Sequence, residues 1–123
     1  IIYFLVDTIL LLYYSRNMNN KTASLKRQLV GFDNVCSGTL LRRYLACGKD
    51  NCRCKAQPPD LHGPYYYWSR RLDGRLVSRV LSASQAKIVG QAIQNYRKAL
   101  QLLRKWEAQT VLILEATKSA GKS

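Results

Sequence analysis

Three of the chain's four cysteines and its single histidine fall within one short stretch, in the pattern C-x4-C-x-C-x7-H. The residues are Cys47, Cys52, Cys54 and His62. Thiolate sulfur and imidazole nitrogen are ligands that zinc prefers. Four such ligands complete its tetrahedral coordination and leave no position for a substrate. The pattern therefore predicts a structural zinc site that stabilises the fold and performs no chemistry.

The segment around these residues has the composition of a metal-binding loop. Gly48, Asp50 and Asn51 favour a tight turn, which would bring two thiolates to one ion. Cys52 and Cys54 are separated by one residue, so we expect irregular backbone that lets both sulfurs face inward. Nearby basic residues would offset the charge of three thiolates; they are Lys49, Arg53 and Lys55.

Other uses of these side chains stay open, because the spacing lacks the paired C-x2-C motif of most zinc knuckles. The cysteines could be ordinary thiols or disulfides, with His62 packed on the neighbouring tyrosines. A redox role is a third option, although the C-x-x-C motif of dithiol oxidoreductases is absent. Cys36 would be the fourth ligand if His62 is not, but an isolated cysteine is more often a small buried hydrophobic residue.

The 123-residue chain is strongly basic, with 20 Lys and Arg against 7 Asp and Glu and a net charge of +13. This charge predicts a polyanionic partner, for which we expect nucleic acid, DNA in preference to RNA, and no membrane. A domain of this size buries little apolar surface, so a bound metal would add stability. Cysteines without a recognisable signal peptide point to a reducing, cytoplasmic location.

The first 17 residues differ from the rest of the chain. Residues 1–14 are apolar except Asp7 and Thr8, but they are fewer than the ~20 needed to cross a bilayer. One hypothesis is that translation begins at Met18 and that residues 1–17 are not native coding sequence. Mass spectrometry of a native product that starts earlier would contradict it. The alternative is an apolar helix that packs on another helix.

Periodicity predicts a short helix and a first strand before the cysteine cluster. The helix would start at Thr22 and end near Gly31 or Asp33, with one apolar face made by Leu25, Leu29 and Phe32. Residues 39–45 are compatible with a strand that delivers Cys47 to the metal.

Asp73 and Gly74 separate two runs rich in aromatic and β-branched residues, which predicts a β-hairpin. Gly74 can adopt the positive φ that a two-residue hairpin turn requires. The register set by this turn has cross-strand pairs on both faces: Trp68–Arg79, Arg70–Val77 and Leu72–Arg75 on one, Tyr67–Val80 and Arg71–Leu76 on the other.

A long C-terminal helix is predicted from Ser82 or Ser84 to about Thr117, followed by a disordered tail at residues 118–123. Its apolar stripe recurs at spacings of four and three: Val89, Ile93, Tyr96, Leu100 and Leu103. The stripe is typical of core packing or of a coiled coil, and a homodimer through this helix would fit it.

Together these elements predict an α+β fold: a short N-terminal helix, a three-stranded antiparallel sheet with a zinc-binding loop, and a long C-terminal helix. Residues 18–117 would form a single domain that is stabilised by the bound zinc ion. An alternative function is a helical protein–protein interaction module that self-associates through residues 84–117 and binds no nucleic acid.

A two-stranded ribbon can enter the DNA major groove, where its arginines pair with guanine edges or phosphates. The candidate residues lie on the strands, the cysteine loop and the long helix: Arg42, Arg53, Arg70, Arg71, Arg75, Arg79, Lys87 and Lys98. Stacking of Tyr65, Tyr66 or Trp68 on unpaired bases is a less favoured interpretation, because strand aromatics in a small protein are more often core.

We do not expect an enzyme. The seven carboxylates are dispersed along the chain, and the zinc-deaminase pattern of H-x-E with P-C-x-x-C is absent. His62 has no evident nucleophile partner.

Two motifs resemble a small uncharacterised domain family of bacteria and archaea, some members of which are labelled transposase-like. They are C-G-K-D-N-C-R-C at residues 47–54 and H-G-P-Y-Y-Y at residues 62–67. The resemblance covers roughly residues 37–108, and residues 1–17 have no counterpart in it. It implies that Cys47, Cys52, Cys54 and His62 are shared ligands. It also implies a DNA-associated or mobile-element context, in which this chain would be an accessory or regulatory protein.

Overall fold

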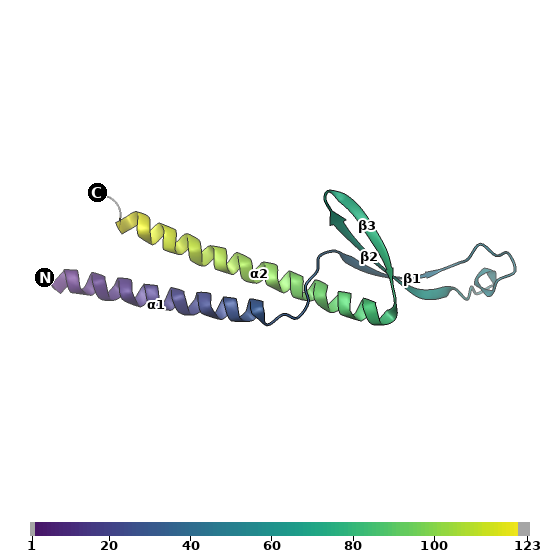
Figure 1. Ribbon diagram of the computed structural model, residues 1–123, viewed down its shortest axis with the longest axis horizontal. Coiled ribbons are helices and arrows are strands. Elements are labelled where there is room, and N and C mark those ends of the chain that lie inside the picture. Colours follow the sequence, from purple (N-terminus) through teal and green to yellow (C-terminus); the bar gives the residue numbers. More distant parts are fainter. Residues whose placement is uncertain (1, 121–123) are drawn as a thin grey trace. The chain divides into compact units, whose positions relative to one another are not determined.

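The computed structural model describes the backbone of residues 2–120 and the side chains of residues 8–13 and 15–117. Its elements in chain order are helix α1 (Ile2–Val30), strand β1 (Thr39–Leu45), the short 3-10 helix η1 (Arg53–Lys55), strands β2 (His62–Leu72) and β3 (Arg75–Leu81), and helix α2 (Ala83–Ala120) (Figure 1). The strands form one antiparallel sheet in the order β1-β2-β3. The predicted α+β architecture is therefore confirmed.

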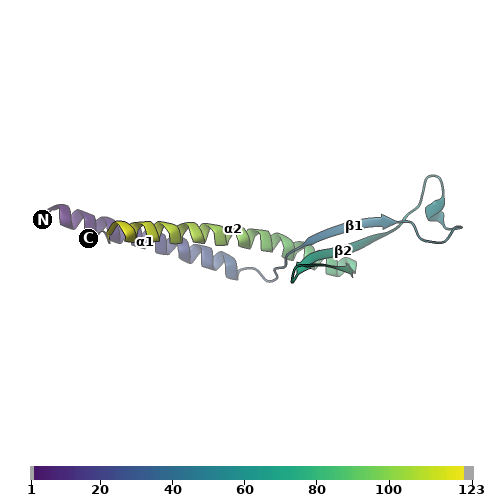
Figure 2. The ribbon, with the colours of Figure 1, turned by 90° about the horizontal axis from the view of Figure 1, so that it is seen from above.

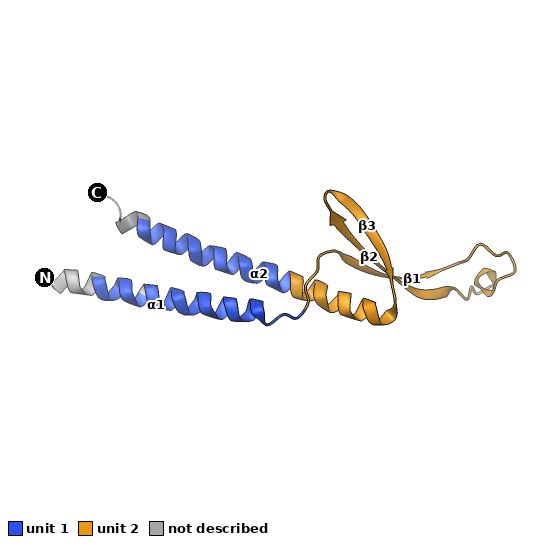
Figure 3. Ribbon diagram, in the orientation of Figure 1, with its two compact units in different colours: residues 1–33, 97–123 blue, residues 34–96 orange. Residues whose placement is uncertain are grey.

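The chain divides into two compact units, which Figure 3 shows in different colours. Unit 1 combines α1 with the part of α2 from Arg97 onward, and unit 2 comprises residues 34–96. One domain over residues 18–117 is expected from the sequence, whereas the boundary between the units falls inside α2. The reason is the length of α2. Its first turns belong to the unit of the sheet, and its residues from Arg97 onward belong to the unit of α1.

The predicted hairpin between β2 and β3 is confirmed in every pair. Trp68 pairs with Arg79, Arg70 with Val77 and Leu72 with Arg75, and the Tyr67–Val80 and Arg71–Leu76 pairs alternate with them. Asp73 and Gly74 have φ of 50° and 77°, the left-handed values of the tight turn expected at this position.

The two faces of the sheet have different surroundings. On one side, which we call the helix-facing face, Leu81 is buried, and Leu40 lies so close to Gly90 of α2 that a Cβ there would be 3.5 Å from it. Trp68 shares this face and donates from its indole Nε1 to the carbonyl oxygen of Ser37 at 3.0 Å. The opposite side is the open face, defined by Leu41, Arg43, Tyr65, Tyr67, Arg71, Leu76 and Val80.

Helix α2 begins with a capping box, which confirms the first of the two predicted cap positions. The backbone N–H of Gln85 donates to Ser82 Oγ at 3.2 Å, and the N–H of Ser82 donates to Gln85 Oε1 at 3.0 Å. The helix then contributes Ala86, Ala92 and Ile93 to the small core of unit 2. Few large side chains are buried in this unit, so the helix and sheet alone give it little stability.

Helix α1 is longer than predicted, because it starts at Ile2 and not at Thr22. No glycine or proline interrupts residues 2–30, so nothing in the sequence stops the helix before Gly31. In unit 1, Leu11 and Met18 line a hollow together with Leu112 and Ala116 of α2. Ile9, Leu10, Leu11 and Leu12 are nevertheless 48–66% exposed, so packing of the N-terminal segment on another helix stays a prediction. Within residues 2–120, no helix has both the length and the apolar composition needed to span a bilayer.

The second half of α2 does not use the predicted apolar stripe for packing. Leu102 is buried, whereas Leu100 and Leu103 are 37% and 49% exposed. Trp106 lies one turn beyond Leu102, and Lys26 of α1 is placed over its ring at 5.4 Å from the centroid. In unit 1, the buried position of α2 is therefore Leu102. Of the two uses predicted for the stripe, core packing does not hold at Leu100 and Leu103, and self-association stays a prediction.

The C-terminal boundary of α2 also differs from the prediction. The helix continues to Ala120, so residues 118–120 are helical where a disordered tail was expected. Residues 121–123, the rest of the predicted tail, lie outside the described residues.

Candidate metal centre and basic surface

The loop between β1 and β2 carries the predicted metal ligands. Cys47 follows the end of β1, Cys52 and Cys54 lie at the start of η1, and His62 is the first residue of β2. Leu45 of β1 pairs with His62 across the sheet, so the ends of the two strands hold the beginning and the end of the loop together. Figures 1 and 2 show this loop beyond the paired part of β1 and β2.

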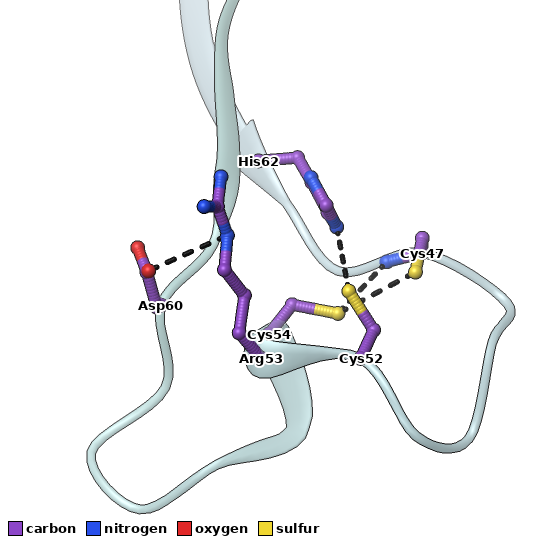
Figure 4. A network of polar contacts seen from close by, with 6 residues as sticks. All are labelled: Cys47, Cys52, Arg53, Cys54, Asp60 and His62. Carbon is purple, nitrogen blue, oxygen red and sulfur yellow. Dashed lines mark hydrogen bonds and ion pairs between the residues drawn. The ribbon is translucent and has the colours of Figure 1, made fainter.

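The four predicted ligand atoms lie within 4.8 Å of one another, and in Figure 4 the sulfurs and the imidazole point toward each other. Cys47 Sγ is 3.6 Å from Cys54 Sγ, and Cys52 Sγ is 3.0 Å from His62 Nε2. The first distance is too long for a disulfide, whose sulfurs are about 2.05 Å apart. It is close to the edge of about 3.8 Å expected between two sulfurs bound at ~2.3 Å to one tetrahedral ion. These residues could therefore hold one metal ion.

Irregular backbone brings Cys52 and Cys54 to the same side, as the sequence requires. Cys52 is extended, with φ of −85° and ψ of 147°, and the chain then enters the single turn of η1. This change of direction brings two sulfurs separated by one residue into one cluster. A turn at residues 50 and 51 directs the chain back from Cys47.

Hydrogen bonds and burial give the thiols different acidities. The pKa of Cys52 is lowered to about 6, first by the backbone N–H of Cys54 and then by the side chains of Cys47, His62 and Cys54. The backbone N–H of Cys47 donates to Cys54 Sγ at 3.3 Å and favours its thiolate. Burial and the neighbouring sulfurs outweigh that bond and raise the pKa of Cys54. A bound cation would be needed to keep all three sulfurs ionised together.

Arg53 does not compensate the cysteine cluster as expected. Its Nε lies 3.4 Å from an oxygen of Asp60, and Figure 4 shows the side chain directed to this carboxylate and away from the sulfurs. Both side chains are 67% exposed, so this ion pair contributes little stability.

Cys36 lies outside the cluster and behaves as the small hydrophobic residue that was expected. It is half-buried, and its Sγ is 3.9 Å from the carbonyl oxygen of Val89. Burial raises its pKa, although the charge of Arg70 partly opposes that shift. His62, and not Cys36, is therefore the fourth member of the candidate metal centre.

The predicted nucleic-acid-binding residues do not form one patch. Arg42, Arg70, Arg75 and Arg79 share the helix-facing face, whereas Arg71 is on the open face. The other candidates lie elsewhere: Arg53 in η1, Lys87 on α2 within unit 2, and Lys98 on α2 within unit 1.

The arginines of the sheet also differ in how accessible they are. Arg70 is half-buried, with its guanidinium 4.7 Å from the centroid of the Trp68 ring. Arg42 donates from Nη2 to the Tyr44 hydroxyl at 2.6 Å. Arg75 and Arg79 are exposed on the edge strand β3 and are therefore free to meet a partner.

Two residues of the open face were missed as candidates. Arg43 pairs with Tyr65, and Tyr67 lies between Leu41 and Val80. Strand alternation groups them correctly, but the sequence did not show which face the helix would leave uncovered. Of the three aromatics proposed to stack on bases, only Tyr65 is on the open face, because Tyr66 and Trp68 share the helix-facing face.

The fold and the cluster define a small α+β protein with a candidate Cys3His metal centre. A family model described as a domain of unknown function, DUF6788, matches residues 15–90. The match spans more than half of the chain and includes the whole cluster, so the protein belongs to this family. The family match starts and ends earlier in the chain than the resemblance over residues 37–108 suggested. No curated protein and no solved structure matches the chain.

Proposed function

We propose that this protein is a small zinc-stabilised protein that binds nucleic acid. The observation that carries the proposal is the convergence of four ligand atoms within 4.8 Å at one end of a strongly basic sheet. Unit 2 contains ten Lys and Arg residues against three Asp residues and no Glu, an excess that favours a polyanionic partner.

Zinc is the metal that fits this donor set best. Three sulfurs and one imidazole nitrogen are soft or borderline ligands, which disfavour magnesium and calcium. Because the protein supplies all of the tetrahedral ligands, no position is left for a substrate, and the ion would have a structural role. It would join the end of β1 to the start of β2, and no catalytic activity is proposed.

The β2–β3 hairpin is the part of the sheet best suited to double-stranded DNA. Its turn projects away from residues 83–96 of α2 in Figure 1. Arg71, Arg75 and Arg79 are exposed on its two strands, and Asp73 is the only acidic residue in β2, β3 and their turn. A ribbon of this kind can enter a major groove or contact phosphates along it. An accessory role in a mobile element is part of the proposal and rests on the resemblance of the cysteine and tyrosine motifs.

We expect the full chain to bind a fluorescently labelled DNA duplex with an affinity that falls steeply with salt. Each phosphate contact adds about −0.9 to the slope of log K against log salt concentration, so several contacts give a slope steeper than about −3. Fluorescence anisotropy at a series of salt concentrations measures the binding constant and therefore this slope. Absence of binding at low salt would contradict the proposal.

The second candidate function is self-association through α2, and one observation favours it. In unit 1, Leu100, Leu103, Val111 and Leu114 are all exposed and share one face of the helix. An apolar stripe of this kind is typical of a helix that packs on a partner. A pure interaction module would leave the anisotropy of the labelled duplex unchanged at every salt concentration.

A further inference from the structure

The open face of the sheet presents aromatic and apolar side chains to solvent. Leu76 is 68% exposed, Val80 58% and Tyr65 40%, and the half-buried Tyr67 is the cross-strand partner of Val80. Single exposed apolar side chains are common, but a contiguous patch of them with a charged rim marks an interaction site.

A hollow continues this face toward the candidate metal centre. Its volume is about 440 Å³, which lies within the range of ~300–1,000 Å³ that is usual for ligand sites. Tyr65, Tyr67 and Leu45 form the wall on the sheet side, and Lys49 stands on the loop side next to Cys47 and Cys52. Two aromatic rings and one cation therefore line the same depression.

The charged residues that the strands place on the open face are all positive. Arg43 is the cross-strand partner of Tyr65, and Arg71 lies further along the same face of β2. The three strands contain no Asp or Glu. A partner of complementary charge is therefore anionic, and the exposed rings favour one that also has flat, stackable groups.

We propose that the open face binds unpaired nucleotides of a single-stranded nucleic acid. Tyr65 and Tyr67 stack on successive bases, and Arg43, Lys49 and Arg71 contact the phosphates that join them. Single-strand-binding surfaces combine a basic groove with aromatic platforms in this way. This inference rests on the proposed function and adds its substrate class: nucleic acid with a single-stranded segment, bound on a face other than the one that carries Arg75 and Arg79.

The test compares the wild-type chain with the variant Tyr65→Leu, Tyr67→Leu, in which apolar strand residues remain but the rings are lost. Three labelled probes are titrated at one salt concentration: a single-stranded oligothymidine, an abasic oligonucleotide with the same number of phosphates, and a duplex. Tyr44→Leu is the matched control, because Tyr44 is also exposed on the sheet but lies outside the open face.

We expect the double variant to bind oligothymidine at least about tenfold more weakly than wild type, because each stacked base contributes enough to change affinity by that factor. Wild type should prefer oligothymidine to the abasic strand, and the variant should not. Duplex binding should be the same in both proteins, and Tyr44→Leu should match wild type. Equal binding of oligothymidine by wild type and variant would overturn the inference and leave the proposed function standing. Failure of wild type to bind any of the probes would overturn both.

Discussion

Replacing Cys52 by serine should unfold unit 2. The substitution removes one of the sulfurs from the cluster, and a serine hydroxyl is a poor zinc ligand. Metal binding in small zinc domains supplies about 10 kcal/mol of folding free energy or more. A domain with a total stability of about 5–15 kcal/mol does not tolerate that loss.

The thin core of unit 2 is the reason for this large effect. Leu81, Ala86, Ala92 and Ile93 are its buried apolar residues near α2, and Cys54 is buried at the cluster. The loop between β1 and β2 has little regular structure besides the short turn of η1. Without a metal, nothing comparable would hold that loop closed or fix the paired ends of β1 and β2.

NMR spectra test this prediction. The amide chemical shifts of β1, β2 and β3 should lose their dispersion in the Cys52→Ser variant. Cys36→Ser is the matched control, since it also exchanges a half-buried sulfur for oxygen but lies outside the cluster. We expect it to cost no more than about 2 kcal/mol. If both variants kept the wild-type spectrum and the same denaturation midpoint, the structural role of the cluster would be refuted.

Replacing both Arg75 and Arg79 by alanine should preserve the fold and weaken duplex binding by at least about a hundredfold. Hydrogen bonds to charged groups contribute about 1.5–3 kcal/mol each, so two lost phosphate contacts account for this factor. The slope of log K against log salt should become shallower by about 1.8. Arg70 is unsuitable for this experiment, because its guanidinium packs over Trp68 and its loss would also disturb the sheet.

A control with the same change in net charge separates a local contact from general electrostatic attraction. Arg16 and Lys21 are exposed on α1, so the variant Arg16→Ala, Lys21→Ala removes two positive charges outside unit 2. It should bind the duplex within about threefold of wild type. Equal weakening by the two double variants would show that the hairpin arginines have no special part in binding.

The features that the sequence predicted correctly are encoded locally. The Asp73-Gly74 turn fixes the register of β2 and β3, because its backbone conformation is specific to a two-residue hairpin. The ligand types at Cys47, Cys52, Cys54 and His62 predicted the cluster even without a standard spacing. The capping box at Ser82 is also a short-range signal.

The features that were missed depend on tertiary packing. Strand alternation groups the open face, but only the position of α2 shows that Tyr65 stays exposed while Leu81 on the opposite face is buried. The stripe of α2 continues in sequence to Leu103, yet α1 covers the neighbouring face at Leu102. Periodicity alone does not distinguish these two adjacent helix faces.

We propose that one zinc ion, bound by three thiolates and one imidazole, holds unit 2 together. Elemental analysis of protein purified without added metal tests it most directly, combined with a thermal melt before and after treatment with a strong chelator. We predict one zinc ion per chain, and loss of the metal together with the sheet's cooperative transition on chelation. Protein that contains no metal yet melts cooperatively, with a midpoint unaffected by the chelator, would contradict the account.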